Sequence, residues 1–384
     1  MGRHVTAPRI ESLPDGIVNL ADFERAAEAR VDPASWAYLN GGAADELTRD
    51  ANRAAWDALR LHPRVLRELG HGHTRVRLLG RELRHPVLLA PIAYQRLFHD
   101  DGELATAHAA AAQEAGLILS AQSSVDLREV AAPMLADPAA GPLWFQLYWR
   151  DDRDFMQDLL QRVQAAGYQA LVLTVDAPVH GARDRERRAG FQLPPHIRAV
   201  NLGGRKQPLD LQPGQSALFD GLMPRAATWA DVDWLRAHSP LPLLLKGVTH
   251  VDDARDALAS GVDGLIVSNH GGRTLDTLPP TAALLPPLRA ALGPDVPLLV
   301  DGGIRRGTDV LKAMALGAHA VLLGRPYVHA LAASGALGVA QALRLLRDEL
   351  EIAMALTGCK TLADAGPALL WPATSLHPCL EDPR

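Results

Sequence analysis

Short apolar runs recur along the chain from residue 86 onward, and each is followed by a stretch with helical periodicity and Gly or Pro punctuation. Near-continuous Val, Leu and Ile residues are what strands buried on both faces require. Helices of about 10 to 15 residues between such strands supply the crossovers of a parallel sheet. The eight runs occupy residues 86–91, 117–120, 143–148, 170–176, 243–247, 264–269, 297–302 and 320–325.

This repeat of eight β/α units predicts an α/β fold of the TIM (β/α)8 barrel type. A doubly wound parallel sheet is the alternative. It would carry a Gly-rich GxGxxG turn after its first strand, and no such turn follows Pro86–Pro91. We therefore expect the barrel.

Two segments fall outside the repeat. Residues 19–62 are predicted to be helical and to flank or plug one end of the barrel, with Asp22 as a helix cap and a stop at Gly41 and Gly42. Residues 190–228 are rich in Pro, Gly and Gln and lie between the fourth strand and its helix. A loop of that length predicts a lid or a partly disordered segment.

The domain boundaries follow from these segments. We expect one domain over residues 19–366, preceded by a tail at 1–18 and followed by a tail at 367–384. Close to its end the domain carries apolar residues at helical spacing and a glycine stop at Gly358, which predicts an amphipathic structural helix. The apolar positions of that helix are Leu343, Leu346, Leu350 and Met354.

Composition and charge narrow the possible partners. The 384 residues include 39 Lys and Arg against 44 Asp and Glu, a formal charge of −5, so the basic stripe of a nucleic-acid-binding protein is not expected. No stretch approaches the ~20 apolar residues of a membrane span, and residues 1–18 lack the apolar core of a signal peptide, so we expect a cytoplasmic protein without a membrane partner. Cys359 and Cys379 have neither a disulfide framework nor metal-site spacing, and no metal is expected.

Polar and glycine residues gather at the ends of the predicted strands. The active site of a TIM barrel lies at the C-terminal ends of its strands, so these are the candidate functional residues. Any one of them could be ordinary strand-end polarity, but the same feature at so many strand ends predicts a site. They are Ser120, Gln146, Tyr148, Thr174, Asp176, Lys246, Ser268, His270, Arg273, Asp301, Arg305, Gly324 and Arg325.

The loops after the seventh and eighth strands combine glycine with arginine. Glycines let backbone N–H groups approach an anion, arginines neutralise it, and TIM barrels bind phosphate at these two loops. Such turns are also common punctuation, yet two of them at these barrel positions predict a phosphate group as ligand. The residues concerned are Asp301, Gly302, Gly303, Arg305, Gly324 and Arg325.

Lys246 ends the fifth strand in the apolar sequence LLLKG. An uncompensated ammonium there would be costly, so the lysine needs an anionic partner or a covalent role. It could form a Schiff base with a carbonyl substrate, or act as a fixed cation beside a cofactor that gains negative charge on reduction. A lysine that extends from the strand end to solvent is the plain structural alternative.

His270 follows the sixth strand, and Asp176 ends the fourth. A neutral imidazole takes a proton near pH 7, and a neighbouring carboxylate would orient it and stabilise the imidazolium. Arg183 and Arg273 lie on loops at the same mouth, where two guanidiniums could hold a carboxylate bidentately; two arginines in surface salt bridges are the alternative. Together with the phosphate loops, these residues predict an enzyme that holds a phosphorylated cofactor and abstracts a proton from a small carboxylic acid.

The order of these motifs resembles the FMN-dependent α-hydroxy-acid oxidase and dehydrogenase family, which includes glycolate, lactate and hydroxymandelate oxidases and mandelate dehydrogenase. The resemblance extends from about Asn19 to Gly366. Its most specific part is the sequence SNHGGRTLD at residues 268–276. The motifs LTVD and LLLKG precede it, and LVDGGIRRGTDV, GRP and MALTGC follow it, in that order.

The resemblance implies a TIM barrel that holds FMN and oxidises an (S)-2-hydroxy acid. It implies His270 as the base, with Asp176 as its partner and Tyr148 assisting. The substrate carboxylate would be held by Arg183 and Arg273, with the hydroxyls of Tyr38 and Tyr148. Residues implied to contact FMN are Ala93, Ser120, Gln146, Thr174, Lys246, Ser268, Asp301, Gly302, Gly303, Arg305, Gly324 and Arg325.

Departures from the family pattern bear on the substrate side chain. The loop after the second strand, residues 121–124, lacks the tryptophan of the glycolate oxidase branch, and His180 stands where Leu or Phe is frequent. The tyrosine at position 94 is similar to the pattern of the hydroxymandelate oxidase branch, so we expect a 2-hydroxy acid with an aryl or medium-length side chain. We expect O₂ as electron acceptor, giving H₂O₂, and a homo-oligomer, a tetramer or octamer. A dehydrogenase using a quinone or another acceptor, a Schiff-base aldolase acting through Lys246, and a barrel that only binds flavin are the alternatives.

Overall fold

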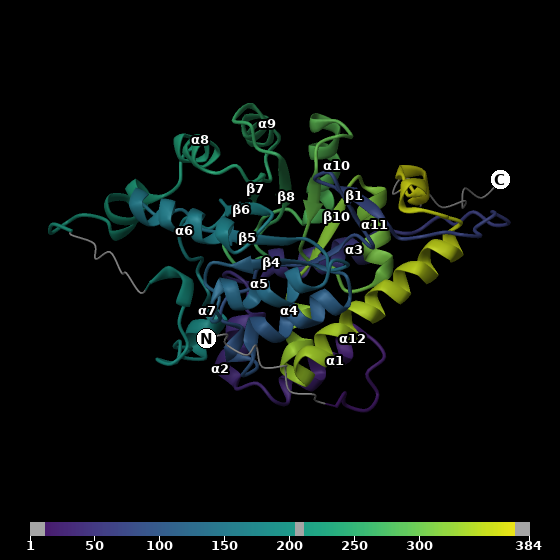
Figure 1. Cartoon of the computed structure of the whole chain (residues 1–384), viewed down its shortest axis with the longest axis horizontal. Coiled ribbons are helices and arrows are strands. Elements are labelled where there is room, and N and C mark those ends of the chain that lie inside the picture. Colours follow the sequence, from purple (N-terminus) through teal and green to yellow (C-terminus); the bar gives the residue numbers. More distant parts are fainter. Residues whose placement is uncertain (1–11, 204–210, 373–384) are drawn as a thin grey trace, which may run out of the picture.

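The computed structural model describes residues 12–203 and 211–372, and its centre is a closed barrel of eight parallel strands (Figure 1). Every strand of the barrel coincides with one of the eight apolar runs, so the predicted barrel is confirmed. The strands pair in the order β10-β3-β4-β5-β6-β7-β8-β9. Their bounds are β3 Val87–Leu89, β4 Gly116–Ser120, β5 Leu143–Leu147, β6 Ala170–Thr174, β7 Leu243–Lys246, β8 Gly264–Val267, β9 Leu298–Val300 and β10 Ala320–Leu323.

Helices surround the barrel and bury the outward-facing side chains of its strands. Parallel strands need such crossovers, which is why the apolar runs alternate with amphipathic stretches. The helices of the repeat are α4 Gly102–Ala112, α5 Leu127–Ala136, α6 Arg153–Ala165, α8 Trp229–His238, α9 Val251–Ala259, α10 Thr281–Leu292, α11 Gly307–Ala315 and α12 Arg325–Thr357.

The barrel interior is a packed core rather than a channel. Alternate strand residues such as Ile118, Val172 and Ile266 point inward and are at most 1% exposed. The same cluster includes Leu78 and Leu83, which belong to the short antiparallel hairpin of β1 (Val76–Leu78) and β2 (Arg81–Leu83). This hairpin therefore closes the barrel end opposite the strand C-termini.

The N-terminal segment is helical, as predicted, but it flanks the barrel rather than plugging it. It forms α1 (Leu20–Glu28), α2 (Pro33–Asn40) and α3 (Leu47–Ala58), with α1 packed on α12 and α3 on α10. The predicted cap is wrong: Asn19 caps α1, and Asp22 is the third helical residue, whose carboxylate accepts hydrogen bonds from the backbone N–H groups of Asn19 and Val18. The predicted stop is confirmed, because Gly41 is the C-cap of α2.

The long loop after β6 carries only short elements among its described residues: α7 (Asp184–Arg188), a 3₁₀ turn at Val200–Leu202, a π turn at Ala217–Leu222 and a 3₁₀ turn at Met223–Arg225. Residues 204–210 of the predicted lid lie outside the described residues. Figure 1 shows α7 beside α2, and the two helices are in contact. The loop thereby joins the N-terminal helices over the C-terminal ends of the strands.

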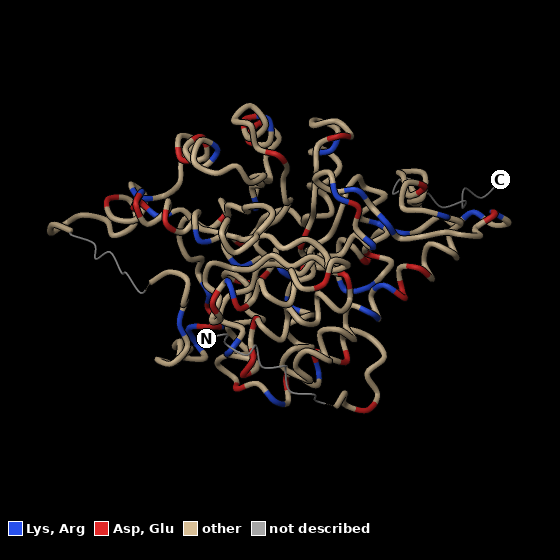
Figure 2. Tube along the Cα trace, viewed as in Figure 1, with Lys and Arg blue, Asp and Glu red and all other residues tan. Residues whose placement is uncertain are grey.

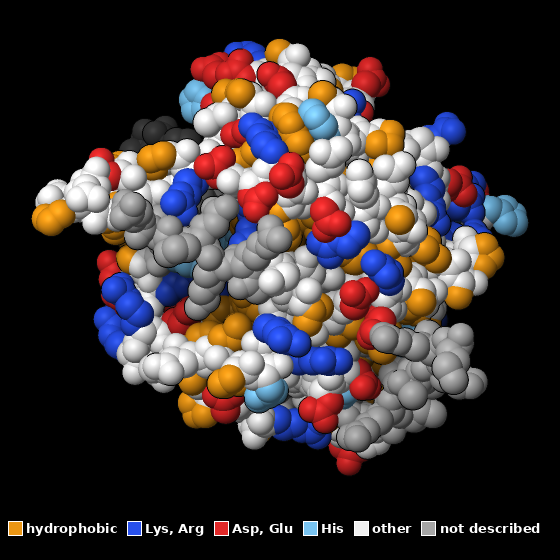
Figure 3. All heavy atoms as spheres, turned by 60° about the vertical axis from the view of Figure 1, so that its left-hand side comes forward, with side chains coloured by type: hydrophobic (Ala, Val, Ile, Leu, Met, Phe, Trp, Pro, Cys, Tyr) orange, Lys and Arg blue, Asp and Glu red, His pale blue; other side chains and the backbone are white. Residues whose placement is uncertain are grey.

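The C-terminal helix α12 ends as predicted, with Gly358 as a left-handed C-cap at φ 79°. It is the helix among the described residues that is long and apolar enough to cross a membrane by length and composition, but 61% of its most apolar window is buried inside the protein. Residues 12–18 and 367–371 also contact the core through Leu13, Ile17 and Leu369. Acidic and basic residues are interspersed along the chain, and both signs occur on the face in Figure 3 (Figures 2 and 3).

Candidate active site

A cavity of about 1750 Å³ opens at the C-terminal ends of the barrel strands. Its wall combines strand-end residues with α2, α3, α7 and the loop after β6. This is the end at which TIM barrels hold their active sites, because eight loops converge there. Most of the sequence-predicted site residues line this cavity. They are Tyr38, Ala93, Ser120, Gln146, Tyr148, Thr174, Arg183, Lys246, His270, Arg273, Asp301, Gly302, Gly303, Arg305, Gly324 and Arg325.

His270 and Asp176 meet as predicted. The Nδ1 atom of His270 lies 2.8 Å from Oδ1 of Asp176, so the imidazole is oriented by the carboxylate and its Nε2 is left for other partners. Burial lowers the pKa of His270 from its usual value, although Asp176 opposes the shift. The imidazole is therefore neutral at pH 7 and able to accept a proton.

The backbone around this pair is unusual. His270, Gly271 and Gly272 all have left-handed conformations, with φ of 56°, 62° and 72°, which turns the chain sharply after β8. A side chain at Gly247 would lie 2.4 Å from the Cβ atom of Asp176. Since Gly247 leaves that space open, the Asp176 carboxylate can approach His270 from behind.

Asp176 is held as an anion. Burial alone would raise the pKa of its carboxyl, but His270 and Lys246 outweigh burial and lower it below the usual value. The Oδ2 atom is buried and has no hydrogen-bond partner among the described residues. Asp176 itself does not line the cavity and acts on it through His270.

Lys246 has an anionic partner. Its Nζ donates to Ser268 Oγ at 2.9 Å and lies 3.3 Å from Asp301 Oδ2. Burial alone would lower the pKa of Lys246, but Asp301 and Asp176 outweigh burial and raise it. A Schiff-base lysine needs the opposite shift, because the attacking amine must be neutral. The environment of Lys246 thus favours a fixed cation.

Ser268 lies behind the cavity wall. The structure places its hydroxyl between Lys246 Nζ and the backbone N–H of His270, which donates to Ser268 Oγ at 3.0 Å. Unlike the other residues predicted to contact the cofactor, Ser268 does not line the cavity. Its position supports the lysine and the histidine rather than a ligand.

Arg305 and Arg325 line the cavity, and neither has a carboxylate within ion-pair distance among the described residues. Arg325 donates instead to the backbone carbonyls of Leu39 and Gly41, at 3.0 and 3.2 Å. Burial lowers the pKa of both Arg305 and Arg325, and at Arg325 repulsion from Arg273 and Arg305 lowers it further. A bound anion would stabilise two guanidiniums in this environment, and their position fits the predicted phosphate group.

Gly324, in the loop after β10, leaves room for a ligand, whereas Gly302 and Gly303 pack closely against Asn52 and Trp56 of α3. A Cβ atom built at Gly324 would find its nearest neighbour, Ala90 Cβ, only at 4.0 Å. The Oδ1 atom of Asp301 is buried and lacks a hydrogen-bond partner among the described residues. An acceptor, two cations and open space at Gly324 fit a ligand that carries hydroxyl groups and a phosphate.

Several residues that sequence reasoning missed hold the loops after β8 and β9 in place. Trp56 Nε1 donates to the carbonyl of Gly302 at 2.7 Å, and Arg53 Nη1 donates to the carbonyl of Gly303 at 2.6 Å. Asn52 exchanges two hydrogen bonds with Asn269, at 2.8 and 2.9 Å. All three residues lie on α3, far from these loops in sequence, and no local motif marks them.

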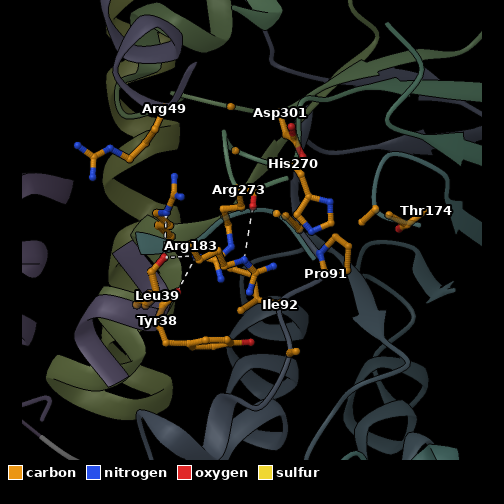
Figure 4. Close-up of a pocket in the computed structure, with 18 of the residues that line it drawn as sticks. Tyr38, Leu39, Arg49, Pro91, Ile92, Thr174, Arg183, His270, Arg273 and Asp301 are labelled. Atoms are coloured by element: carbon orange, nitrogen blue, oxygen red, sulfur yellow. Dashed lines mark hydrogen bonds between the residues drawn. The ribbon is translucent and has the colours of Figure 1, made fainter. Parts of the chain in front are cut away.

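The second half of the cavity contains Tyr38, Arg183 and Arg273 (Figure 4). In this view the two arginine side chains lie side by side next to His270, and the ring of Tyr38 lies beneath them. Arg273 Nη1 donates to the backbone carbonyls of Tyr38 and Gly41 at 2.6 and 3.0 Å. Arg49, by contrast, points away from this group.

Each of these arginines keeps donors available. Among the described residues, hydrogen bonds from Arg273 use Nη1, so the edge formed by Nε and Nη2 has no partner. Arg183 donates from Nη1 to Glu186 at 3.3 Å and weakly from Nε to the Arg273 carbonyl, leaving Nη2. Burial, with repulsion from Arg183, lowers the pKa of Arg273. A substrate carboxylate would satisfy both guanidiniums.

Tyr38 and Tyr148 present hydroxyls to the same cavity, and neither hydroxyl has a hydrogen bond to a described residue. Burial raises the pKa of Tyr148 to about 12 and raises that of Tyr38, so both are neutral donors. Phe191, another residue that sequence reasoning missed, stacks on Tyr38 with ring centroids 4.6 Å apart.

A group of polar strand-end residues lines the barrel side of the cavity. Gln146 Nε2 donates to Thr174 Oγ1 at 3.0 Å, and Ser120 Oγ accepts from the backbone N–H of Gln122 at 3.2 Å. Ala93 also lines the cavity, beside the strand end of β3. Their predicted contact with a flavin ring remains a prediction, but the structure brings them to one surface.

Comparison with known proteins agrees with this geometry. Residues 27–372 match the family model described as FMN-dependent dehydrogenase. The chain is 47% identical over 366 residues to an L-lactate oxidase of Alicycliphilus denitrificans, covering 94% of this chain and 99% of that protein. It is 44% identical to a 4-hydroxymandelate oxidase of Amycolatopsis orientalis, covering 91% and 96%.

Solved structures show the same relationship. A crystal structure of mandelate oxidase with (S)-2-phenylpropionate superposes with a TM-score of 0.82 at 43% identity, covering 92% of this chain and 98% of that one. The family resemblance of the sequence is thereby confirmed. With its barrel, its basic loops and its His–Asp pair, the chain belongs to the FMN-dependent dehydrogenase family, and its cofactor is FMN.

Proposed function

We propose that this protein oxidises an (S)-2-hydroxy acid to the 2-oxo acid and passes the electrons to O₂, which yields H₂O₂. The observation that carries the proposal is the neutral His270 imidazole, held 2.8 Å from Asp176 beside two guanidiniums with unused donors. A base next to a carboxylate site fits a substrate in which the carbon that is oxidised bears the carboxylate.

The cavity fits FMN as the cofactor. Arg305, Arg325 and the glycine loops would hold its phosphate, and the unpartnered Oδ1 of Asp301 would accept from a ribityl hydroxyl. Lys246 would lie at the ring as a fixed cation. When bound, FMN accepts the two electrons of the oxidation and delivers them to the final acceptor.

The residues of the chain prepare the substrate for that step. Arg183 and Arg273 bind its carboxylate, while Tyr38 and Tyr148 donate hydrogen bonds to its oxygens. His270 Nε2 removes one proton, either from the hydroxyl as a hydride leaves carbon or from carbon itself. In both cases Asp176 stabilises the resulting imidazolium. General base catalysis of this kind typically contributes about 10²–10⁴-fold to the rate.

The substrate side chain is proposed to be aryl or medium-length, similar to mandelate or lactate. Relatives named L-lactate oxidase, 4-hydroxymandelate oxidase and mandelate oxidase support this range. Tyr94 supports an aryl substrate, because it contributes an aromatic side chain to the cavity wall. The loop at residues 121–124 adds room, since it carries no aromatic side chain.

The test is anaerobic mixing of the purified yellow protein with (S)- and (R)-enantiomers of lactate and mandelate. We expect an (S)-enantiomer to bleach the flavin absorbance, and oxygen to restore it with one equivalent of H₂O₂. Electrons that pass to a quinone or dye but not to O₂ would reassign the protein as a dehydrogenase. A flavin that no 2-hydroxy acid bleaches would overturn the proposal.

Two further proposals concern the setting of the enzyme. We propose a homo-oligomer, a tetramer or octamer, which the family resemblance supports, and a cytoplasmic location, which the nearly balanced charge supports. Light scattering on the eluted protein tests the first proposal, and a monomer at micromolar concentration would contradict it. Cell fractionation tests the second.

A further inference from the structure

A cluster of two tryptophans and an arginine lies at one edge of the cavity. Trp149 follows Tyr148 directly after β5, and it lines the cavity. Trp234 of α8 packs edge-on against it, with ring centroids 5.7 Å apart and an interplanar angle of 74°. The Arg153 guanidinium lies over both rings, 4.3 Å from the centroid of Trp149 and 4.8 Å from that of Trp234.

The cluster is fixed by an ion pair and a helix cap. Arg153 Nη2 donates to Asp231 Oδ1 at 2.6 Å. The other oxygen of Asp231 accepts from the backbone N–H and the hydroxyl of Thr228, the N-cap of α8, at 2.8 and 2.9 Å. Because α8 begins where the loop after β6 ends, these contacts tie that loop to the end of β5.

The position of Trp149 makes it part of the substrate half of the cavity. Its Cα lies about 3.8 Å from that of Tyr148, because the two residues are adjacent. Burial and the charges of Lys246, Asp176 and Arg183 act on the Tyr148 hydroxyl, so Tyr148 faces the reacting groups. Leu222 and Ala226 of the loop after β6 line the same cavity. Trp149 therefore lines the same cavity as the catalytic groups and that loop.

We propose that Trp149 is a specificity-determining residue that selects 2-hydroxy acids with an aromatic side chain, and that Arg153 is a positioning residue that holds its indole. This inference rests on the proposed function. An indole braced by Trp234 and Arg153 offers a rigid apolar surface to a planar ring, and aromatic pairs gain attraction beyond their buried area. A methyl side chain, as in lactate, is too short to gain from this surface.

Arg153 acts through geometry more than through charge. Its side chain is 45% exposed, and an ion pair at such a site contributes little by itself. Its flat guanidinium, however, lies over both indole rings while Asp231 fixes its direction. Removing it frees Trp149 to change rotamer, whereas lysine at this position keeps a cation over the rings.

The experiment measures anaerobic flavin reduction by (S)-mandelate and L-lactate, with rate and apparent Kd, in wild type and Trp149→Ala. We expect the rate-to-Kd ratio for mandelate to fall by about 10 to 100-fold relative to the ratio for lactate. The loss should lie mainly in Kd. Trp229→Ala is the matched control, because Trp229 is an exposed tryptophan of the same helix α8 that does not line the cavity.

A second readout keeps the inference separate from the proposed function. Binding of benzoylformate, followed by its perturbation of the flavin spectrum, needs no turnover, and Trp149→Ala should weaken it more than binding of pyruvate. If no hydroxy acid bleaches wild-type flavin, the proposed function fails while this binding test still judges Trp149. Equal losses for aryl and methyl ligands, or no loss at all, would overturn the inference.

Two more variants address folding and position. If Trp149→Ala loses flavin or solubility, Trp149→Phe keeps a ring and should show a smaller but still aryl-selective loss. Arg153→Ala should shift the mandelate-to-lactate ratio in the same direction as Trp149→Ala, and Arg153→Lys, which keeps a cation but no flat face, should shift it less. An unchanged ratio in Arg153→Ala would show that Arg153 does not position the indole.

Discussion

The two halves of the cavity are built in different ways. The half with Lys246 and Asp301 consists of strand ends, where Lys246 pairs with Asp301 and donates to the fully buried Ser268, while Asp301 Oδ1 is buried without a partner among the described residues. The half with Tyr38, Arg183 and Trp149 comes from loops and short helices, and several of its polar groups have no partner among the described residues. The first half is suited to holding a permanent cofactor, and the second to ligands that come and go.

This difference predicts which changes affect which property. Substitutions in the strand-end half should alter cofactor binding and stability, because they leave buried groups unpaired. Substitutions in the loop half should alter Kd and selectivity while the fold remains. His270 lies between the halves. Its imidazole acts on the substrate, and its orientation depends on Asp176 at the end of β6.

The largest effect is expected for His270→Gln. Loss of the base should lower the rate of flavin reduction by about 10⁴-fold or more, at or beyond the upper end of general base catalysis, while the flavin absorbance is retained. Stopped-flow reduction by saturating substrate measures this. His250→Gln, at the exposed N-cap of α9, is the control and should leave the rate unchanged. Substantial activity in His270→Gln would mean that another group is the base.

Next in size is Lys246→Met. It leaves the buried Asp301 carboxylate without its cation, so we expect a loss of about 3–5 kcal/mol in the free energy of unfolding, together with weakened FMN binding. Denaturant unfolding of holoenzyme and apoprotein measures both. Lys360→Met breaks the pair of Lys360 with Glu68 at the surface and should cost far less stability, because solvent screens exposed ion pairs. Equal costs would show that the strand-end half is not the rigid one.

A smaller effect is expected for Arg273→Lys. A lysine cannot offer the Nε and Nη2 edge to a carboxylate, so KM should rise by about 10 to 100-fold with kcat changed much less. Arg188→Lys is the matched control, because Arg188 is an exposed arginine of the same helix α7 that pairs with Asp184 and does not line the cavity. Its KM should stay within about threefold of wild type. A KM that does not change in Arg273→Lys would remove Arg273 from the carboxylate site.

The smallest effect concerns pH. His270 must be neutral to act, and burial lowers its pKa below the usual 6.5, so kcat/KM should fall with acid only below about pH 6.5. Asp176 opposes that shift, so Asp176→Asn should move this acid limb to still lower pH as well as lowering the rate. A pH profile of kcat/KM measures both. An acid limb above pH 7 would contradict the assigned environment of His270.

Much of this site could be predicted because its residues sit at strand ends. Each apolar run marks a strand, and TIM barrels bring all strand ends to one face, which is why the meeting of His270 with Asp176 was predictable. For Lys246 the sequence predicted the need for an anionic partner or a covalent role, because burying an ammonium alone is costly, but it did not identify the partner. The structure identifies that anion as Asp301.

Other features left no local signal. Asn52 and Asn269 are 217 residues apart, and nothing in either segment marks their pairing. The three-residue strands of the β1–β2 hairpin are too short for a period to emerge, so their role in closing the barrel was missed. Asn19 and Asp22 are both good N-cap residues, and sequence alone did not rank them. The contact between Trp149 and Trp234 likewise joins the end of β5 to helix α8, two elements far apart in sequence.

The most direct test of the strand-end half as a flavin phosphate site is the affinity of the apoprotein for FMN compared with riboflavin. The two ligands differ only in the phosphate that Arg305 and Arg325 are assigned to bind. Fluorescence titration should show FMN binding at least about 100-fold more tightly, as charge-assisted hydrogen bonds from two guanidiniums require. Equal affinity for the two flavins, or no binding of FMN, would contradict the assignment.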